Sequence, residues 1–468
     1  MVPFKHSQGF VLSDGKFPYF KQVALGALAG IGTLALIIVG FTVSGVATTN
    51  SPAPQQTQAQ ASATPTTSVT PNSTRTCSVA TQAADARLAT FSGIVINADT
   101  DEVLFDRNGS TPAATASTMK LLTAVAALNV LGPNYRVETK VYSDAADPGS
   151  IYLVGAGDPT LSRLPAGKQS VYKDAPKLAD LAIGVKAALG ATQVSKITLV
   201  STAFAGATWE SSWERSEQTQ GYMSEVTALQ VDGDRANPSA ETSARSTSPV
   251  NNAGKWFKSA LGATAANATV VTGSLPNGAS QITSVLSQPI SQWVKHMLLV
   301  SDNTQAEFLA RLVSLKQGFD GSFSSISAAY KRALSSTGLD SSNLVIKDGS
   351  GLSDFNAVPP LYLAKLSKLI MSGTGNYQVV LQGLPIAGES GSLASRFKGD
   401  NLDASGHIIA KTGWIKRGYT LAGIINSPDG THLTFAVYAL GNVKDDAKQA
   451  IDDLVTAIYR CGNTLSNN

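Results

Sequence analysis

Patterns typical of β-strands occur at both ends of the region that follows residue 76. Near its start, FSGIVINADTDEVLFDRNG at 91–109 contains two β-rich runs around turn residues 98–101, which predicts a hairpin. Near its end, residues 407–440 predict three strands in a meander, and a helix with one apolar face follows them. Helical patterns occupy much of the sequence between. We therefore expect an α/β (α+β) domain whose sheet is assembled from the two extremities of this region.

The two cysteines of the chain, Cys77 and Cys461, bracket the same region. In an oxidising compartment a disulfide between them would join its first and last helices. Two unrelated thiols are the alternative, but positions at opposite ends of the folded part favour pairing. We expect the disulfide.

Residues 136–286 differ from the two ends of this region in their pattern of predicted elements. They contain β-rich runs on both sides of a helical pattern at 177–190, together with a long loop-like stretch. This composition predicts a second α/β domain, inserted into the first. The first domain would then comprise residues 77–135 and 287–468.

The N-terminal segment predicts export. Residues 22–47 carry no charged side chain, and as a helix they would span roughly 39 Å, enough for a hydrocarbon core of ~30 Å. Lysines precede this run and no basic residue follows it before Arg75, so residues 1–21 would be a cytoplasmic tail and the rest would lie outside. A cleaved signal peptide that yields a secreted protein is the alternative. Residues 48–76, rich in Pro, Ser, Thr and Gln, predict a disordered linker.

Composition excludes several classes of protein. Apolar residues make up 43% of the 468 residues and charged residues 15%, so a mainly disordered chain is excluded. The net charge of +3 is too small to indicate a nucleic-acid partner. The four histidines are scattered, without an HExxH motif or a Cys/His cluster. We expect no metal site and no cofactor.

Three short motifs occur in order along the chain: STMK at 117–120, SDN at 301–303 and KTG at 411–413. Each alone is weak, but the ordered set is a specific signal for serine acyl-transfer enzymes. Ser117 and Lys120 would share one face of a helix that continues as LLTAVAALNVL. Burial there would lower the pKa of Lys120, so that its amine could take the serine proton. The simpler interpretation is a capping serine with a snorkelling lysine.

The SDN motif lies between two helical patterns. Ser301 could relay a proton between Lys120 and a leaving amine, while the Asn303 amide holds the peptide group of a substrate. The simpler interpretation is an interhelical turn in which Thr304 and Glu307 form a capping box.

The KTG motif lies on the first strand of the meander. Lys411 and the Thr412 hydroxyl could bind a carboxylate, and Gly413 would permit close backbone approach. The backbone N–H groups of Ser117 and Trp414 would then form an oxyanion hole. A glycine-containing edge strand is the simpler interpretation, but it leaves the lysine and threonine unexplained.

With these motifs the sequence resembles the D-alanyl-D-alanine carboxypeptidase/endopeptidase family, the class C low-molecular-mass penicillin-binding proteins, over roughly residues 85–460. Further matching segments are YLVGAGDPTL at 152–161, VTALQVDGDR at 226–235, DGSGLS at 348–353 and LPIAGESGSLASRF at 384–397. The resemblance implies a penicillin-binding/serine β-lactamase-like transpeptidase domain, with the second α/β domain inserted between the first and second motifs.

The same resemblance implies a serine-type D-Ala-D-Ala carboxypeptidase that trims peptidoglycan stem peptides on the extracytoplasmic side of a bacterial cell membrane. Ser117 would be the acylated nucleophile and Lys120 its base, with β-lactams as covalent inhibitors. Two departures stand out: Trp414 occupies a position where many members have a small hydroxyl residue, and the segment after VDGDR is short. The second departure leaves the balance between carboxypeptidase and endopeptidase activity open.

Other functions share parts of this pattern. A β-lactamase has the same three motifs, but the long span from Ser117 to Ser301 favours an inserted domain, and no Glu-x-x-Leu-Asn segment is present. A Ser/His/Asp hydrolase would need a GxSxG elbow around Ser117, which the chain lacks there. A β-lactam or peptidoglycan sensor that is acylated without turnover stays open.

Overall fold

The computed structural model describes residues 74–467. The predicted tail, membrane segment and nearly all of the predicted linker lie outside the described residues. Within 74–467, none of the helices combines the length and apolar character that crossing a membrane requires.

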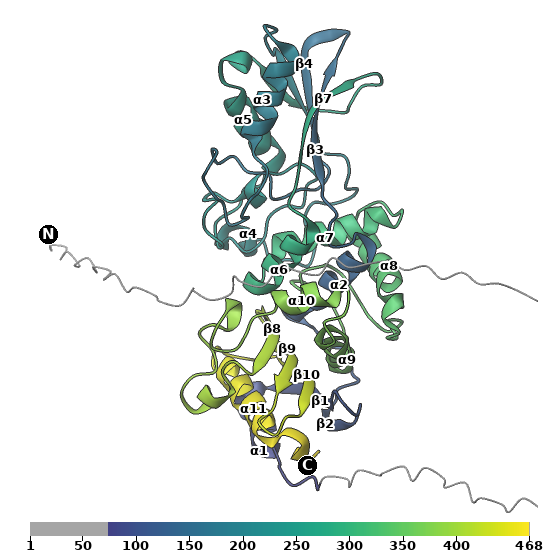
Figure 1. Cartoon of the computed structure of the whole chain (residues 1–468), viewed down its shortest axis with the longest axis vertical. Helices are drawn as coiled ribbons and strands as arrows, with labels where there is room; N and C mark the ends of the chain where they lie inside the picture. The colour runs from purple at the N-terminus through teal and green to yellow at the C-terminus, as the bar shows by residue number, and fades with distance from the viewer. Residues whose placement is uncertain (1–73, 468) are drawn as a thin grey trace, which may run out of the picture. The chain divides into compact units, whose positions relative to one another are not determined.

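The first sheet is built from both ends of the described chain (Figure 1). Its strands, in spatial order, are β2 (Val103–Arg107), β1 (Thr90–Asn97), β10 (His432–Leu440), β9 (Gly418–Asn426) and β8 (Ile408–Ile415). All neighbours are antiparallel, and β1 pairs with β10 from Thr90↔Leu440 to Asn97↔Leu433. The predicted hairpin and the predicted meander are thus confirmed, and the β1–β10 pairing joins them into one sheet.

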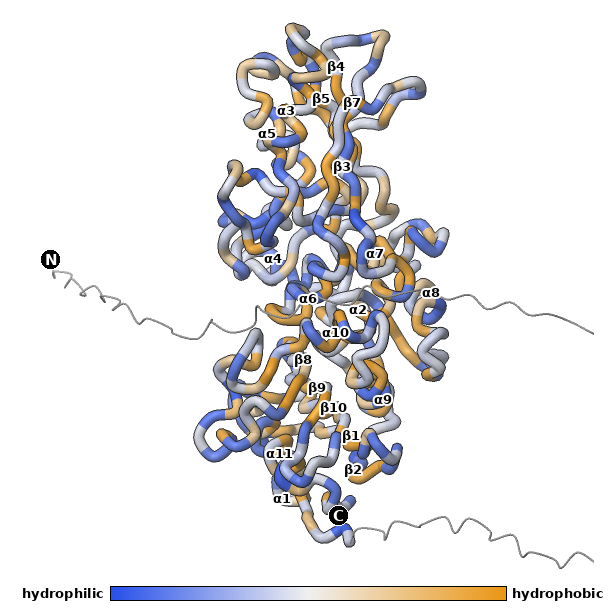
Figure 2. Tube along the Cα trace, viewed as in Figure 1, coloured by the Kyte–Doolittle hydropathy of each residue, from blue (hydrophilic) through white to orange (hydrophobic). Residues whose placement is uncertain are grey.

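Both faces of this sheet are buried because its strands are apolar on both sides. Val95 packs in a core with helix α11 (Ala447–Cys461), whereas its neighbours Ile94 and Ile96 pack against Ala364 of α9 (Pro360–Met371). This follows from the alternation of side chains along a strand. Figure 2 shows the apolar residues concentrated along β8, β9 and β10.

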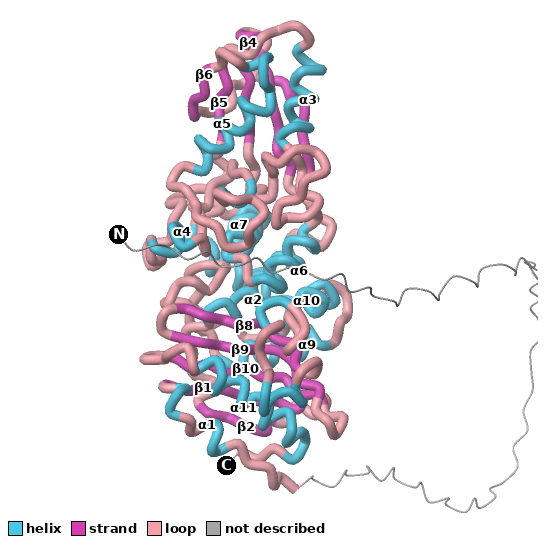
Figure 3. The backbone as a smooth tube through the Cα atoms, turned by 90° about the vertical axis from the view of Figure 1, so that its left-hand side faces the viewer, coloured by secondary structure: helices cyan, strands magenta, loops and turns pink. Residues whose placement is uncertain are grey.

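A group of helices lies between the first sheet and the second (Figures 1 and 3). It comprises α2 (Lys120–Val130), α6 (Ile290–Val300), α7 (Asn303–Lys316), α8 (Phe323–Leu334) and α10 (Tyr377–Gly383), whereas α9 lies beside the first sheet. Helix α2 contacts α6, α7, α8 and α10, and each residue from Lys120 to Leu128 is buried. A helix that is buried all round needs apolar residues all round, which accounts for the sequence LLTAVAAL.

The second sheet lies between α2 and α6 in the sequence. Its spatial order is β6 (Thr269–Thr272), β5 (Lys196–Val200), β4 (Asp147–Val154), β3 (Glu138–Asp144) and β7 (Ser280–Leu286). Helices α3 (Leu178–Leu189) and α5 (Pro249–Leu261) share its apolar core. The predicted fold class, with a second α/β domain inserted between the first and second motifs, is confirmed. Figure 3 shows long loops, with α4 (Ser216–Gln220), between this sheet and the helices below it.

Short elements complete the fold. They are helix α1 (Ala80–Ala83) and the 3₁₀ turns η1 (Ala86–Leu88), η2 (Ala116–Met119), η3 (Asp232–Asp234), η4 (Gly262–Ala265), η5 (Ser335–Thr337), η6 (Gly391–Leu393), η7 (Gly399–Ala404) and η8 (Gly462–Thr464).

The predicted Cys77–Cys461 disulfide is present, with a Cα–Cα distance of 5.4 Å. It joins the segment before α1 to the last residue of α11, which covers one face of the first sheet. The bond therefore closes a loop that contains both domains.

Replacing both cysteines with serine should lower the free energy of unfolding by about 2–4 kcal/mol, because the unfolded chain loses a constraint over a long loop. Urea denaturation of the Cys77→Ser/Cys461→Ser variant beside the oxidised parent measures this difference. Peptide mapping of the exported protein without reductant should recover the two cysteines in one linked peptide. Two free thiols, or equal stability of the two proteins, would contradict the assignment.

Candidate active site

Ser117 lies in η2, the 3₁₀ turn that leads directly into α2. The Thr420 hydroxyl of β9 donates to the Thr115 carbonyl at 2.7 Å, which fixes the start of this turn against the first sheet. Strand β8 passes so close that a Cβ at Gly413 would lie 2.9 Å from the Ser117 nitrogen. Only glycine at this position therefore allows the strand to lie against the serine.

Lys120 is fully buried one helical turn after Ser117. Its Nζ donates to Ser117 Oγ at 2.8 Å, to Asn303 Oδ1 at 2.7 Å and to the Ser350 carbonyl at 2.8 Å. Burial lowers the pKa of the Lys120 amine to about 8, although nearby buried carboxylates act in the opposite direction. The amine is thus within reach of the serine proton and titrates near neutral pH.

Ser301 and Asn303 lie on the turn between α6 and α7. Ser301 adopts the left-handed conformation (φ 66°, ψ 39°) that ends α6, and Asp302 caps α7 by accepting a hydrogen bond from the Gln305 nitrogen at 2.9 Å. The alternative of a capping box formed by Thr304 and Glu307 is wrong. Because the helix already begins at Asn303, Thr304 lies inside it.

Lys411 is the third side chain to reach this centre. It is buried on β8, and its Nζ donates to Ser301 Oγ at 2.9 Å and to the Thr412 carbonyl at 2.8 Å. Burial, with the charge of Lys120 second, holds the pKa of Lys411 well below its usual value. The three motifs therefore meet at two lysine–serine pairs, Lys120 with Ser117 and Lys411 with Ser301.

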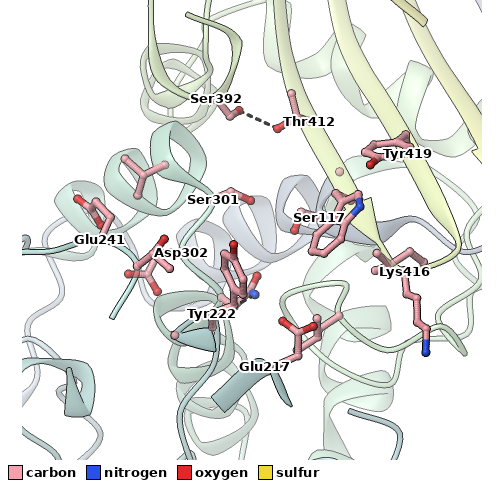
Figure 4. A pocket seen from close by; sticks show the side chains of 18 of the residues that line it. Ser117, Glu217, Tyr222, Glu241, Ser301, Asp302, Ser392, Thr412, Lys416 and Tyr419 are labelled. Carbon is pink, nitrogen blue, oxygen red and sulfur yellow. Dashed lines mark hydrogen bonds between the residues drawn. The ribbon is translucent and has the colours of Figure 1, made fainter. Parts of the chain in front are cut away.

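These pairs lie at a cavity of about 510 Å³. Its lining includes Ser117, Ser301, Asn303, Thr412, Gly413 and Trp414, several of which Figure 4 shows around the opening. Lys120 and Lys411 are buried behind this surface. Trp414 is 47% exposed, and its ring lies 6.4 Å from that of Tyr222, which is 43% exposed and comes from the inserted domain.

Sequence reasoning missed how deeply the DGSGLS segment enters this centre. Its Ser350 carbonyl contacts Lys120, and the Glu307 carboxylate holds the segment by accepting from the nitrogens of Gly349 and Ser350. Asp348 accepts from the Gly351 nitrogen and from the Trp213 indole. Burial raises the pKa of Glu307 to about 8 and also raises that of Asp348. A carbonyl contact leaves no trace in side-chain identity, so no pattern in the sequence could have indicated it.

The inserted domain also reaches the SDN turn. Arg235 donates to Asp302 Oδ2 at 2.8 Å, and the Tyr172 hydroxyl donates to the same oxygen at 3.1 Å. All three side chains are buried. Burial alone would raise the pKa of Asp302, but the Arg235 charge holds it below its usual value. In addition, the Asn303 amide donates to the Tyr222 carbonyl at 3.2 Å. Asp302 and Asn303 are therefore both tied to the inserted domain.

The described residues contain no group of three or more His, Cys, Asp or Glu side chains that could hold a metal ion. The groups at the cavity are a serine hydroxyl beside a lysine amine, backbone N–H groups, and a lysine–threonine pair that could bind a carboxylate.

Comparisons with known proteins point to one family. The D-Ala-D-Ala carboxypeptidase 3 (S13) family matches residues 75–246 and 235–460. Carboxypeptidase DacB of Mycolicibacterium smegmatis is 31% identical over 450 residues, which cover 92% of this chain and 96% of that protein. The D-alanyl-D-alanine carboxypeptidase of an Actinomadura species is 27% identical over 454 residues, covering 77% of this chain and 79% of that protein.

The solved structure of penicillin binding protein 4 from Haemophilus influenzae has the same fold, with a TM-score of 0.70 at 21% identity. The structural match covers 82% of this chain and 99% of the Haemophilus influenzae protein. The resemblance that the three motifs indicated is confirmed, and the chain belongs to the D-Ala-D-Ala carboxypeptidase 3 (S13) family of serine carboxypeptidases.

Proposed function

We propose that Ser117 is the nucleophile of this D-Ala-D-Ala carboxypeptidase and that Lys120 is its base. The observation that carries this proposal is the 2.8 Å contact between Lys120 Nζ and Ser117 Oγ, made by a fully buried amine beside a cavity. The substrate would be a peptidoglycan stem peptide that ends in D-Ala-D-Ala. A β-lactam would enter the same cavity and acylate the same oxygen.

In the acylation step, neutral Lys120 takes the Ser117 proton and Oγ attacks the carbonyl carbon of the penultimate D-Ala. The negative charge that develops on the carbonyl oxygen accepts hydrogen bonds from the backbone N–H groups of Ser117 and Trp414. The C–N bond then breaks, and the leaving amine of D-Ala receives the proton through the Ser301 hydroxyl. Water hydrolyses the acyl-serine ester in the second step, with Lys120 again as base.

Burial lowers the pKa of Lys120 enough for a fraction of the amine to be neutral, and so able to take the proton, at neutral pH. Each amine is desolvated, and Lys120 adds to the lowering of the Lys411 pKa. A substrate that brings its own carboxylate toward Lys411 and Thr412 compensates positive charge at that end of the site. Asn303, whose amide oxygen accepts from Lys120, would hold the peptide group of the substrate with the rest of its amide.

The domain boundaries and the membrane attachment belong to the same proposal. Residues 77–135 and 287–468 would form the peptidase domain and 136–286 the accessory domain. Action on peptidoglycan is extracytoplasmic, and a disulfide is typical of such compartments. We propose that residues 22–47 anchor the enzyme, with 1–21 on the cytoplasmic side and 48–76 as the linker.

Ser117→Ala and Lys120→Ala should both abolish acylation by a labelled penicillin, because one variant lacks the attacking oxygen and the other lacks the base. Intact-mass spectrometry of the adduct measures this effect, with Lys398→Ala as an exposed-lysine control that labels at the parent rate. If either active-site variant labels at the parent rate, the role given to that residue is wrong.

The same assay separates the remaining functions when D-alanine release from a diacetyl-Lys-D-Ala-D-Ala peptide is measured beside it. An adduct together with D-alanine release supports the carboxypeptidase. A persistent adduct without release would indicate a sensor, and rapid hydrolysis of the penicillin would indicate a β-lactamase.

The rate of acylation should rise with pH until the Lys120 amine is neutral. With its pKa at about 8, the second-order rate constant should fall about tenfold per unit below that pH and level off above it. Stopped-flow measurement with a chromogenic β-lactam between pH 6 and pH 9 gives the profile. A rate that is flat across this range would exclude a base that titrates near pH 8.

A further inference from the structure

A second hydroxyl lies beside Thr412 at the cavity. Ser392 Oγ is 2.7 Å from Thr412 Oγ1 (Figure 4), and both residues line the cavity together with Ser117. Ser392 belongs to η6 and precedes Thr412 by 20 residues in the sequence. The sequence identified the GESGSL segment only as part of a stretch that resembles the family, so this contact gives the segment a more specific role.

The backbone fixes the position of Ser392. The segment before η6 pairs with the outer edge of β8, since the Ala387 nitrogen donates to the Ile408 carbonyl at 2.9 Å and the Ala410 nitrogen donates to the Pro385 carbonyl at 3.0 Å. Next to Ser392, Gly391 has φ +55°, and a Cβ there would overlap the Leu299 carbonyl oxygen at the end of α6. Ser392 is therefore held between β8 and α6 on a turn that glycine makes possible.

Strand β8 on its own offers few donors to an anion at this place. Thr412 and Trp414 point to the same side of the strand, but Trp414 carries an indole ring and Gly413 has no side chain. A single hydroxyl donates one hydrogen bond, whereas a carboxylate has two oxygens that each accept. Ser392 supplies the second hydroxyl, and in the free enzyme one of the two hydroxyls donates a hydrogen bond to the other.

The position of the nucleophile sets the direction of the substrate along β8. The Ser117 nitrogen lies against Gly413, so Thr412 and Trp414 lie on opposite sides of the attacking serine along the strand. Lys411, whose Nζ donates to the Thr412 carbonyl, places a basic group at the Thr412 end. The residue that leaves, with its free acid group, thus belongs at Thr412 and Ser392, and the acyl part belongs toward Trp414 and Tyr222.

We propose that Ser392 and Thr412 together bind the C-terminal carboxylate of the substrate, with one hydroxyl donating to each oxygen. The inference rests on the proposed function, because it concerns the same cavity. It makes Ser392 a residue that contacts substrate and selects peptides and β-lactams with a free acid group.

The test compares penicillin G with its methyl ester, which keeps the reactive ring and lacks the free carboxylate. Intact-mass spectrometry follows the rate at which each forms an adduct on Ser117. In Ser392→Ala the ratio of the acid rate to the ester rate should fall about tenfold, because a hydrogen bond to a charged group is lost only with the acid. Ser392→Thr keeps the hydroxyl and should keep the ratio within about twofold.

Two further variants make the result decisive. Ser395→Ala removes an exposed serine of the same segment that does not line the cavity, and its ratio should equal that of the parent. Ser392→Cys preserves much of the side-chain volume but replaces the hydroxyl with a weaker hydrogen-bond donor. It should therefore lower the ratio of the acid rate to the ester rate. This variant keeps the test valid if thermal denaturation shows that Ser392→Ala does not fold.

Equal losses with acid and ester in folded Ser392 variants would mean that Ser392 only supports the turn, and an unchanged ratio would mean that it makes no contact with the carboxylate. Either result overturns the inference. Failure of the proposed function looks different, since the parent enzyme would then form no adduct on Ser117 with either compound.

Discussion

The desolvation of one amine is the constraint on which the rest of the site depends. Lys120 is enclosed on a helix that is otherwise apolar, and its three hydrogen bonds join Ser117 to Asn303 and to the Ser350 carbonyl. An ammonium group with three partners and no exposed surface is held in one position, and burial brings its pKa toward neutrality. The burial of Lys120 thus sets both the position of its amine and the pKa at which that amine can accept a proton.

That enclosure requires segments from most of the chain to meet. The β1–β10 pairing brings the C-terminal strands beside the N-terminal hairpin, and β8 at the sheet edge then lies against η2. The turn at Ser301 adds the second serine from the helical layer, in a backbone conformation that non-glycine residues seldom adopt. Such a conformation persists where its surroundings hold it, and the buried Arg235–Asp302 pair supplies that hold.

The sequence predicted the parts that depend on local pattern. β-rich runs separated by turn residues predicted β1, β2 and the strands of the meander, and the order of STMK, SDN and KTG predicted the family. It could not predict contacts that depend on tertiary packing. The Ser350 carbonyl on Lys120 involves backbone, Arg235 and Asp302 are far apart along the chain, and Ser392 lies on a turn whose glycines indicated only a bend. The capping box failed because Asp302, not Thr304, caps α7.

Glu307 and Asp348 are two buried carboxyl groups that influence the protonation state of Lys120. Two carboxyl groups lie buried close to the amine, and burial raises the pKa of both. Were both ionised, their charges would raise the pKa of Lys120 and favour the ammonium form, which cannot accept a proton. Because desolvation and mutual repulsion favour protonating one of them, the pair limits that effect while its oxygens still hold the loop that presents Ser350. The loop is thus fixed by carboxyl groups without the full negative charge that two carboxylates would bring to the base.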